Sequence, residues 1–309
     1  MPRKQRLPQP RVTTRDALTG DAMSNPRTVA MIGLGQMGGH MADHIAASGA
    51  ELRAFDVSEP ALDARVAAGA LRATSSADAT TGADVIGIVV FDDAQVYSVL
   101  TGDAGVLAAV KPGAVIAVHS TVRVDSIHEF AALARAAGAR LIDAGISGGE
   151  VGSRAGTLVT MVGGDDDAVA AARPVFETFS KEVVHAGALG SGMALKIARN
   201  LVGYVLMAAT HEGMALAHAG GVDLRQLEHV LRETNLDAQI YAPFMFGGPE
   251  PLGVDAPEQQ TVELTHLLRL AQKDLDDALD LGRALDVSIP TTDVTRRQFD
   301  AVTRLRAEG

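Results

Sequence analysis

Lys196 and Asn200, four residues apart, are the pair of side chains in this chain best suited to proton chemistry. They occur in the segment 189–206, whose apolar pattern predicts a long helix buried between other elements. A spacing of four places both side chains on one face of that helix. A buried lysine is costly unless it has a partner or a task, and its pKa falls readily on burial. Lys196 is therefore a candidate acid or base, although most helical lysines simply extend to solvent.

Composition excludes several classes of protein. The 309 residues, 47% of them hydrophobic, are enough for two domains. A net charge of −11 argues against a nucleic-acid binder, and no run of apolar residues is long enough to predict a membrane helix. The absence of cysteine excludes disulfides and thiol catalysis, and the nine histidines show no metal-ligand spacing. We expect a cytoplasmic protein without a metal site.

The first 26 residues differ from the rest of the chain. They contain five basic residues and lack the hydrophobic stretch of a secretory signal: the basic residues are Arg3, Lys4, Arg6, Arg11 and Arg15. We interpret 1–26 as a disordered tail, or as residues added by an early start codon, since Met23 directly precedes the first predicted strand. A basic interaction arm is the alternative.

From residue 28 to about 164, short aliphatic runs alternate with helical patterns. Continuously apolar runs indicate strands buried on both faces, as in a parallel sheet covered by helices. The predicted strands are 28–32, 52–55, 85–90, 114–118 and 140–143. After about residue 187 the helical periodicity dominates. We therefore expect an α/β domain with a doubly wound parallel sheet over 27–187, then an all-helical C-terminal domain for substrate binding and dimerisation over 188–309.

A glycine-rich motif follows the first predicted strand and opens a helix. It runs Gly33-Leu34-Gly35-Gln36-Met37-Gly38. Gly33 permits a tight turn, Gly35 lets the backbone approach a pyrophosphate, and Gly38 lets helix and strand pack closely. The helix N-terminus would then supply amide donors to the phosphates. The pattern predicts that 27–187 is a Rossmann-type domain that binds a dinucleotide through these six residues.

Asp56 ends the second predicted strand, where an acid would contact the adenosine ribose. A carboxylate there accepts both ribose hydroxyls and repels a 2′-phosphate. The next residues, Val57 and Ser58, include no arginine to bind that phosphate. The sequence therefore favours NAD over NADP. A glycine turn without a ligand, beside a solvated aspartate, is the alternative.

A second glycine-rich stretch includes Ser147, Gly148 and Gly149 after the last predicted strand. A hydroxyl and bare backbone donors in such a turn could hold a small carboxylate. A flexible turn is the alternative, and spacing alone does not choose between them.

Taken together and in order, these motifs resemble the β-hydroxyacid dehydrogenase family, which includes 3-hydroxyisobutyrate dehydrogenase and tartronate, glyoxylate and succinic semialdehyde reductases. The resemblance covers the chain from about residue 28 to its end. The motifs that carry it are 33–38, Ser120-Thr121, Ser147-Gly148-Gly149, Gly190-Ser191-Gly192 with Lys196 and Asn200, and Lys273-Asp274-Leu275.

The resemblance implies an NAD-dependent oxidoreductase that interconverts a small β-hydroxy acid and its semialdehyde. Lys196 would be the general acid/base, and Asn200 would orient the substrate. It further implies Ser147, Gly148 and Gly149 as carboxylate ligands, Val90 and Phe91 as backbone contacts to the cofactor, Thr121 near the nicotinamide, and Lys273 as a cofactor contact from the C-terminal domain. The expected partners are the small-molecule substrate and further copies of the chain in a homodimer or homotetramer, with no nucleic acid or membrane.

Several positions depart from the family pattern. Phe91, Val124 and Gly145 stand where proline is usual, and His119 stands where aspartate is frequent. The loop 234–241 also lacks the usual small residues. These changes remove no proposed chemical group. They therefore bear on the identity of the substrate and not on the type of reaction. An imine reductase, which generally has aspartate or tyrosine at the position of Lys196, and an inactive dinucleotide sensor are the rival interpretations.

Overall fold

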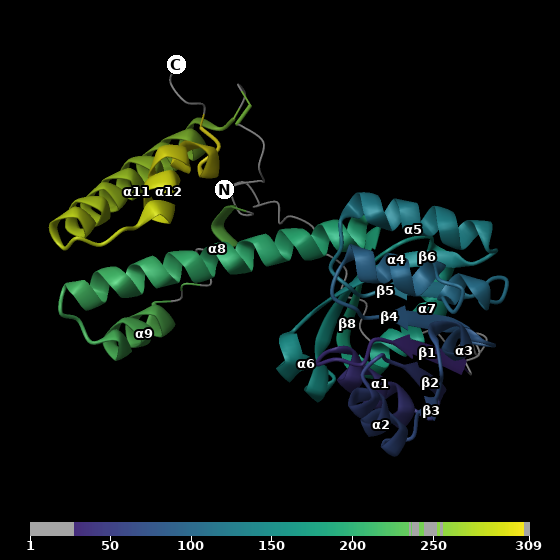
Figure 1. The fold of residues 1–309 in the computed structure, drawn as a ribbon. Helices are drawn as coiled ribbons and strands as arrows, with labels where there is room; N and C mark the ends of the chain where they lie inside the picture. The colour runs from purple at the N-terminus through teal and green to yellow at the C-terminus, as the bar shows by residue number, and fades with distance from the viewer. Residues whose placement is uncertain (1–27, 235, 237–240, 244–251, 254–255, 306–309) are drawn as a thin grey trace. The chain divides into compact units, whose positions relative to one another are not determined.

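The chain divides into two units within one long helix, α8 (Ser191–Ala219). In this computed structural model the first unit ends at Ala198 and the second begins at Arg199. The structure describes residues 28–234, 236, 241–243, 252–253 and 256–305 (Figure 1). The predicted tail 1–26 and most of the loop 234–241 therefore lie outside the described residues.

The first unit contains an eight-stranded sheet in the order β3-β2-β1-β4-β5-β6-β7-β8 (Figure 1). Neighbouring strands from β3 to β6 pair in parallel, β7 is antiparallel to β6, and β8 is parallel to β7. The chain order reverses between β1 and β4, where open α/β sheets bind ligands at the carboxyl ends of the strands. The strands are β1 Thr28–Ile32, β2 Glu51–Phe55, β3 Leu71–Arg72, β4 Val85–Ile88, β5 Val115–Val118, β6 Arg140–Ser147, β7 Leu158–Gly163 and β8 Ser180–Gly187.

Helices cover both faces of this sheet, which makes it a Rossmann-type doubly wound fold. Alternate residues of β1 belong to two separate cores: Val29 and Met31 pack with α1 and α7, and Ala30 and Ile32 pack with α4 and α5. This burial on both sides explains the continuously apolar strands. The helices are α1 Gly38–Ala47, α2 Glu59–Ala67, α3 Ser76–Thr80, α4 Asp93–Thr101, α5 Val124–Ala136, α6 Gly149–Ala155 and α7 Asp166–Phe179, with a 3₁₀ turn at Val106–Ala108.

The sheet is larger and more mixed than the sequence predicts. β4 ends at Ile88, two residues before the predicted end, and β6 continues to Ser147. β3, β7 and β8 were not predicted. After β6 the short helix α6 returns the chain at the same edge of the sheet, so β7 pairs antiparallel to β6, whereas a parallel strand would need a full crossover.

The second unit is helical within its described residues. Besides the later part of α8 it contains α9 Leu224–Glu233, α11 Glu258–Ala284 and α12 Pro290–Val302. Glu212 of α8 accepts hydrogen bonds from the backbone N–H groups of Thr291 (2.6 Å) and Thr292 (2.9 Å). Burial opposes ionisation of Glu212, but these hydrogen bonds outweigh it and lower the pKa of the carboxyl. Glu212 therefore caps the start of α12, a role that the sequence pattern did not indicate.

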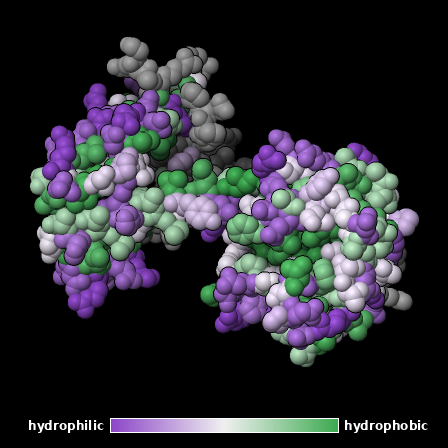
Figure 2. All heavy atoms as spheres, viewed as in Figure 1, coloured by the Kyte–Doolittle hydropathy of each residue, from purple (hydrophilic) through white to green (hydrophobic). Residues whose placement is uncertain are grey.

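Helix α8 is buried at only a few positions of the single chain, near its start and at Glu212, which corrects the expectation of a helix buried along its length. Met193 and Lys196 are buried. Large apolar side chains between residues 195 and 207 are 37–68% exposed in the single chain, and Figure 2 shows hydrophobic residues at the surface of the molecule: these side chains are Leu195, Ile197, Leu201, Val202, Tyr204, Val205, Leu206 and Met207. No helix among the described residues is both long and apolar enough to cross a membrane.

His119, which follows β5, lies in the core of the first unit. Its Nδ1 lies 2.8 Å from the carbonyl oxygen of Ala144 and, facing an acceptor, carries the proton. Its ring makes edge contacts with Phe176 and Phe179 at centroid distances of 5.3 and 5.8 Å. Burial lowers the pKa of His119 from 6.5 to about 4, only partly offset by the hydrogen bond. The imidazole is therefore neutral and structural.

His119 predicts a specific loss of stability in acid. Because its folded pKa is depressed, its contribution is intact above pH 6.5 and is lost as the pH falls toward 4. We expect this histidine to remove roughly 2–3 kcal/mol from the free energy of unfolding between pH 7 and pH 4.5, measured by urea titration. His119→Asn, which keeps an N–H donor without the titration, should reduce that dependence, and exposed His229→Asn should not. Equal pH dependence in wild type and His119→Asn would contradict this assignment.

Candidate active site

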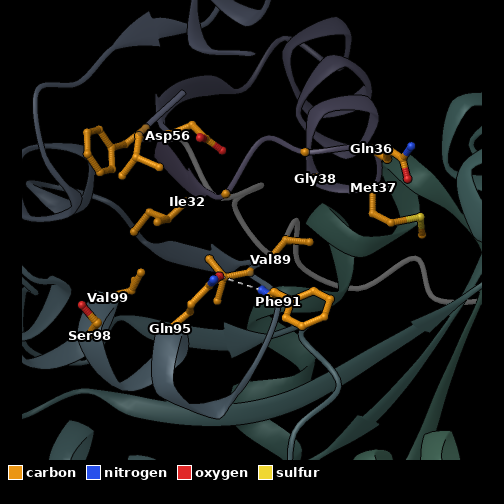
Figure 3. A pocket seen from close by; sticks show the side chains of 15 residues that line it. Ile32, Gln36, Met37, Gly38, Asp56, Val89, Phe91, Gln95, Ser98 and Val99 are labelled. Carbon is orange, nitrogen blue, oxygen red and sulfur yellow. Dashed lines mark hydrogen bonds between the residues drawn. The ribbon is translucent and has the colours of Figure 1, made fainter. Parts of the chain in front are cut away.

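A cavity of about 630 Å³ opens at the carboxyl ends of β1 and β4. Five of the six residues of the glycine motif line it, together with Asp56, Val90 and Phe91 (Figure 3). Gln95, Ser98 and Val99 contribute a further wall from α4. The structure thus brings most of the predicted cofactor residues to one cavity, at the position where a doubly wound sheet binds its ligand.

Glycine is required in the motif for different geometric reasons. Gly33 has φ +89°, and a Cβ there would lie 2.1 Å from the carbonyl oxygen of Val89. A Cβ on Gly38 would lie 2.0 Å from the carbonyl oxygen of Gly33. At Gly35, by contrast, a Cβ would have no described atom within 4 Å. The open space beside Gly35 therefore fits a pyrophosphate, and a side chain would fill it.

Asp56 is held in a fixed orientation at the cavity wall. Its Oδ2 accepts a hydrogen bond from the backbone N–H of Leu34 at 2.5 Å, and its Oδ1 accepts one from Ser58 at 2.7 Å. Figure 3 shows its side chain beside the cavity. A carboxylate fixed there can accept hydrogen bonds from ribose hydroxyls and places a negative charge against any 2′-phosphate. Leu34 itself does not line the cavity, and its backbone N–H donates a hydrogen bond to Asp56.

The backbone donors of Val90 and Phe91 are already engaged. The N–H of Val90 donates to Ser120 Oγ at 2.8 Å, and that of Phe91 donates to Gln95 Oε1 at 3.0 Å (Figure 3). A backbone contact from these residues to a cofactor would therefore use their carbonyl oxygens. Gln95 was not predicted as a site residue. Its position three residues after Asp92, the N-cap of α4, matches a capping box and could have indicated it.

Thr121, the second residue of the Ser120-Thr121 motif, is exposed and does not line the cavity.

Lys196 is only 8% exposed and packs against β6. A Cβ added to Gly145 would lie 2.8 Å from Lys196 Cβ and 3.0 Å from Lys196 Cγ. Gly145 has no positive φ, so the close approach of the lysine explains the glycine. Ser147 follows two residues later on the same strand and therefore lies on the same face. The departure from proline at Gly145 thus makes room for the stem of Lys196.

The start of α8 is anchored by one buried carboxylate, Asp143 of β6. Its Oδ1 accepts from the backbone N–H of Gly190 at 2.7 Å, and its Oδ2 accepts from Met193 at 2.5 Å. Burial raises the pKa of Asp143, and the two hydrogen bonds oppose that rise. Two N–H groups that the helix itself cannot satisfy are thereby paired with a negative charge. Nothing in the sequence near Asp143 marks this role, because its partners are 47 and 50 residues away.

The glycine next to the anchor lets α8 pack directly on β7. A Cβ on Gly192 would lie 2.5 Å from the carbonyl oxygen of Met161 and 2.6 Å from the backbone nitrogen of Gly163. The Gly190-Ser191-Gly192 motif therefore places the helix backbone against the sheet. Together with Asp143, this contact fixes the turn of α8 that precedes Lys196.

The turn after β6 has the conformation that its glycines allow. Gly148 has φ +137° and Gly149 has φ +62°, values that other residues adopt only with strain. A Cβ on Gly149 would have no described atom within 4 Å. The turn therefore combines the Ser147 hydroxyl with accessible backbone, as a small-ligand site requires.

Two of the predicted site residues belong to the second unit. Asn200 follows Lys196 by one helical turn of α8, and its Oδ1 lies 3.4 Å from Arg199 Nη1. Lys273 is on α11 and makes an ion pair with Asp274 at 2.7 Å. Their contributions to the site remain predictions.

The sequence matches two families along nearly its whole described length. Residues 28–187 match the NAD binding domain of 6-phosphogluconate dehydrogenase. Residues 190–309 match the family described as the NAD-binding domain of NADP-dependent 3-hydroxyisobutyrate dehydrogenase. These matches, the doubly wound fold and the cavity define an NAD(P)-binding domain followed by the helical domain of a dehydrogenase.

Relatives with assigned names show which family of dehydrogenases the chain belongs to. The chain is 36% identical to the NAD-dependent L-serine dehydrogenase of Pseudomonas aeruginosa, covering 85% of this chain and 88% of that protein. It is 34% identical to the 3-hydroxyisobutyrate dehydrogenase of the same organism, covering 91% and 93%. A solved structure from Mycobacterium avium 104 superposes with a TM-score of 0.79 at 34% identity, covering 90% of this chain and 99% of that one. The chain belongs to the β-hydroxyacid dehydrogenase family.

Imine reductases share this fold. The enzyme from Myxococcus stipitatus superposes with a TM-score of 0.74 at 17% identity, covering 89% of this chain and 92% of that one. At that identity the likeness concerns the fold alone.

The open space beside Gly35 predicts a separation of cofactor binding from stability. Gly35→Val should raise the Kd for NADH at least 10-fold, because the new side chain occupies the space proposed for the pyrophosphate. It should leave the free energy of unfolding within about 0.5 kcal/mol, since no described atom is close. Gly33→Ala, with its positive φ and its contact to Val89, should instead lower the free energy of unfolding. Fluorescence titration and urea unfolding check both; unchanged NADH affinity in Gly35→Val would contradict the site.

Proposed function

We propose that this protein is an NAD-dependent dehydrogenase that interconverts a small β-hydroxy acid and its semialdehyde by hydride transfer. The observation that carries the proposal is the burial of Lys196 on Gly145, on the strand that runs into the Ser147-Gly148-Gly149 turn. A positioned amine, a carboxylate-binding turn and a dinucleotide cavity are the three parts that such a reaction needs. Membership of the family supports their combination.

The protein's task in this reaction is to position the substrate and manage one proton. Bound NAD supplies the hydride acceptor. The neutral amine of Lys196 accepts the proton of the substrate hydroxyl during oxidation, and its ammonium form donates a proton to the alkoxide during reduction. Such a group contributes about 10²–10⁴-fold to the rate. Ser147 and the backbone of Gly148 and Gly149 hold the substrate carboxylate.

The remaining assignments concern orientation and cofactor binding. Asn200 orients the substrate one turn after Lys196, and Thr121 lies near the nicotinamide. Lys273 reaches the cofactor from the C-terminal domain. Val90 and Phe91 contact the cofactor through their carbonyl oxygens or side chains, since their N–H groups are engaged.

The two named relatives suggest the chemical class of the substrate. L-Serine and 3-hydroxyisobutyrate share the frame HO–CH₂–CH(X)–COO⁻ and differ only in X, an amino group or a methyl group. The shared hydroxyl suits Lys196, and the shared carboxylate suits the Ser-Gly-Gly turn. We propose a substrate with this frame. Glyoxylate or succinic semialdehyde reduction on the same architecture is the alternative, and an inactive dinucleotide sensor would bind NADH without turnover.

An imine reductase is disfavoured by the lysine itself. Those enzymes generally have aspartate or tyrosine at this position, whereas here Lys196 is buried against a glycine that accommodates it.

We also propose that the exposed apolar side chains of α8 pack against a second copy of the chain in a homodimer or homotetramer.

Removing the amine of Lys196 tests the proposal. Lys196→Ala should lower kcat for 3-hydroxyisobutyrate or L-serine at least 100-fold, since the proton acceptor is lost. Its Kd for NADH should stay within 2-fold of wild type. Lys181→Ala, which removes an exposed lysine on β8, is the matched control and should keep full turnover. Near-full turnover in Lys196→Ala would overturn the assignment.

Displacing Lys196 without removing it gives an independent test. Gly145→Ala places a methyl group within 3 Å of the lysine stem. We expect kcat to fall about 10-fold, less than in Lys196→Ala, because a misplaced group loses part of its catalytic contribution. NADH affinity should not change, and initial rates with fluorescence titration measure both. Unaltered kcat would show that this contact does not position the amine.

Asp56 predicts the choice of cofactor. In the wild type, kcat/KM should be at least 100-fold higher with NAD than with NADP, because the fixed carboxylate repels the 2′-phosphate. Asp56→Asn removes the charge and should reduce that ratio at least 10-fold. Asp63→Asn, on the exposed face of α2, should preserve it. A wild-type preference for NADP would contradict the role of Asp56.

A further inference from the structure

Helix α6 connects the two halves of the proposed site within the first unit. Its first residue, Gly149, is also the last residue of the Ser147-Gly148-Gly149 turn. Its other end contacts the segment that carries the glycine motif, Met37 and helix α1. The helix is only seven residues long, so a displacement of one end is transmitted to the other.

Ser153 makes the first connection and has no part in the mechanism. Its side chain is completely buried, and its Oγ donates to the carbonyl oxygen of Met37 at 2.8 Å, across 116 residues of sequence. Met37 lines the cofactor cavity and immediately precedes α1. The same carbonyl accepts from the N–H of Met41 at 3.1 Å. Ser153 therefore ties α6 to the first turn of α1.

His44 makes the second connection, from the last turn of α1. Its Nε2 lies 3.1 Å from the carbonyl oxygens of both Ser153 and Arg154. Carbonyl oxygens only accept hydrogen bonds, so Nε2 carries the proton and serves two carbonyls at the end of α6. A Cβ on Gly156, which has φ +66°, would lie 3.0 Å from His44 Cε1. The end of α6 is thus held against α1 by a hydroxyl, an imidazole and a close packing contact.

We propose that α6 couples cofactor binding to substrate binding, with Ser153 and His44 as the positioning residues. The inference rests on the proposed function, which assigns the motif 33–38 to the pyrophosphate and the turn 147–149 to the substrate carboxylate. A bound pyrophosphate restrains Met37 and the start of α1. Ser153 and His44 pass that restraint to α6 and so to the turn. The second ligand then binds to a turn that is already ordered. Its binding therefore no longer includes the free energy cost of ordering the turn.

The coupling must be reciprocal, because it is a free energy shared by both ligands. The hydroxy acid should tighten NADH binding by the same factor by which NADH tightens hydroxy acid binding. A pair of reduced ligands is suited to measuring it, since NADH and a hydroxy acid cannot exchange a hydride. Couplings of this kind typically fall between about 5-fold and 150-fold.

The test is a fluorescence titration of the full chain with NADH, alone and with saturating 3-hydroxyisobutyrate, repeated with L-serine. In the wild type we expect at least one acid to lower the Kd for NADH by 5-fold or more. Ser153→Ala should reduce that factor below 2-fold while the Kd for NADH alone changes less than 3-fold. His44→Phe, which keeps the ring but loses the N–H, should do the same. Ser48→Ala, which removes a hydroxyl that donates to Ile45 at the end of α1, should retain the wild-type factor.

Two results would overturn the coupling and leave the proposed function standing. One is turnover in the wild type without any effect of either acid on NADH affinity. The other is a wild-type factor retained in both Ser153→Ala and His44→Phe. Absence of turnover with every hydroxy acid, together with absence of acid binding, would instead overturn the proposed function and this inference with it.

Discussion

The two hydrogen bonds from Gly190 and Met193 to the carboxylate of Asp143 fix where α8 begins, and the proposed chemistry depends on that position. A buried carboxylate is costly, and the raised pKa of Asp143 reflects that cost. The amides of Gly190, which directly precedes α8, and of Met193 in its first turn offset that cost, because they lack partners within the helix and lie at its positive end. Gly192 then lets the helix backbone meet β7, and Lys196 follows over Gly145. The amine is thus positioned by contacts that involve neither ligand.

The cofactor cavity depends on a different constraint, close backbone approach at the switch point of the sheet. Gly33 and Gly38 bring β1, α1 and the end of β4 together, and Gly35 keeps the space between them open. Asp56 is fixed by the same loop through the N–H of Leu34. Helix α6 lies between this cavity and the substrate turn, bonded to Met37 at one end and continuous with Gly149 at the other. The cavity and the substrate turn are therefore connected through α6 by hydrogen bonds from Ser153 and His44.

Local signals explain which parts of this arrangement the sequence could predict. The motif 33–38, the acid Asp56 and the continuous apolar strands are read within short windows, and the cavity is lined by Asp56 and by every residue of the motif except Leu34. The anchor Asp143, the contact of Gly145 with Lys196 and the bond from Ser153 to Met37 join residues far apart in sequence. Nothing near any of these residues marks its partner. Likewise, the apolar pattern of α8 predicted burial but could not show how few of its residues are buried within one chain.

Amide hydrogen exchange at the start of α8 in Asp143→Asn tests the central claim most directly. An asparagine keeps the shape of the side chain but loses the charge and one acceptor. We predict faster exchange of the Gly190 and Met193 amides and of the turn that leads to Lys196, with protection of β1 and β4 unchanged. Asp223→Asn, which weakens the cap of α9 at Arg225, should affect only its own helix. Unchanged exchange over 190–196 in Asp143→Asn would contradict the claim that this carboxylate positions the lysine.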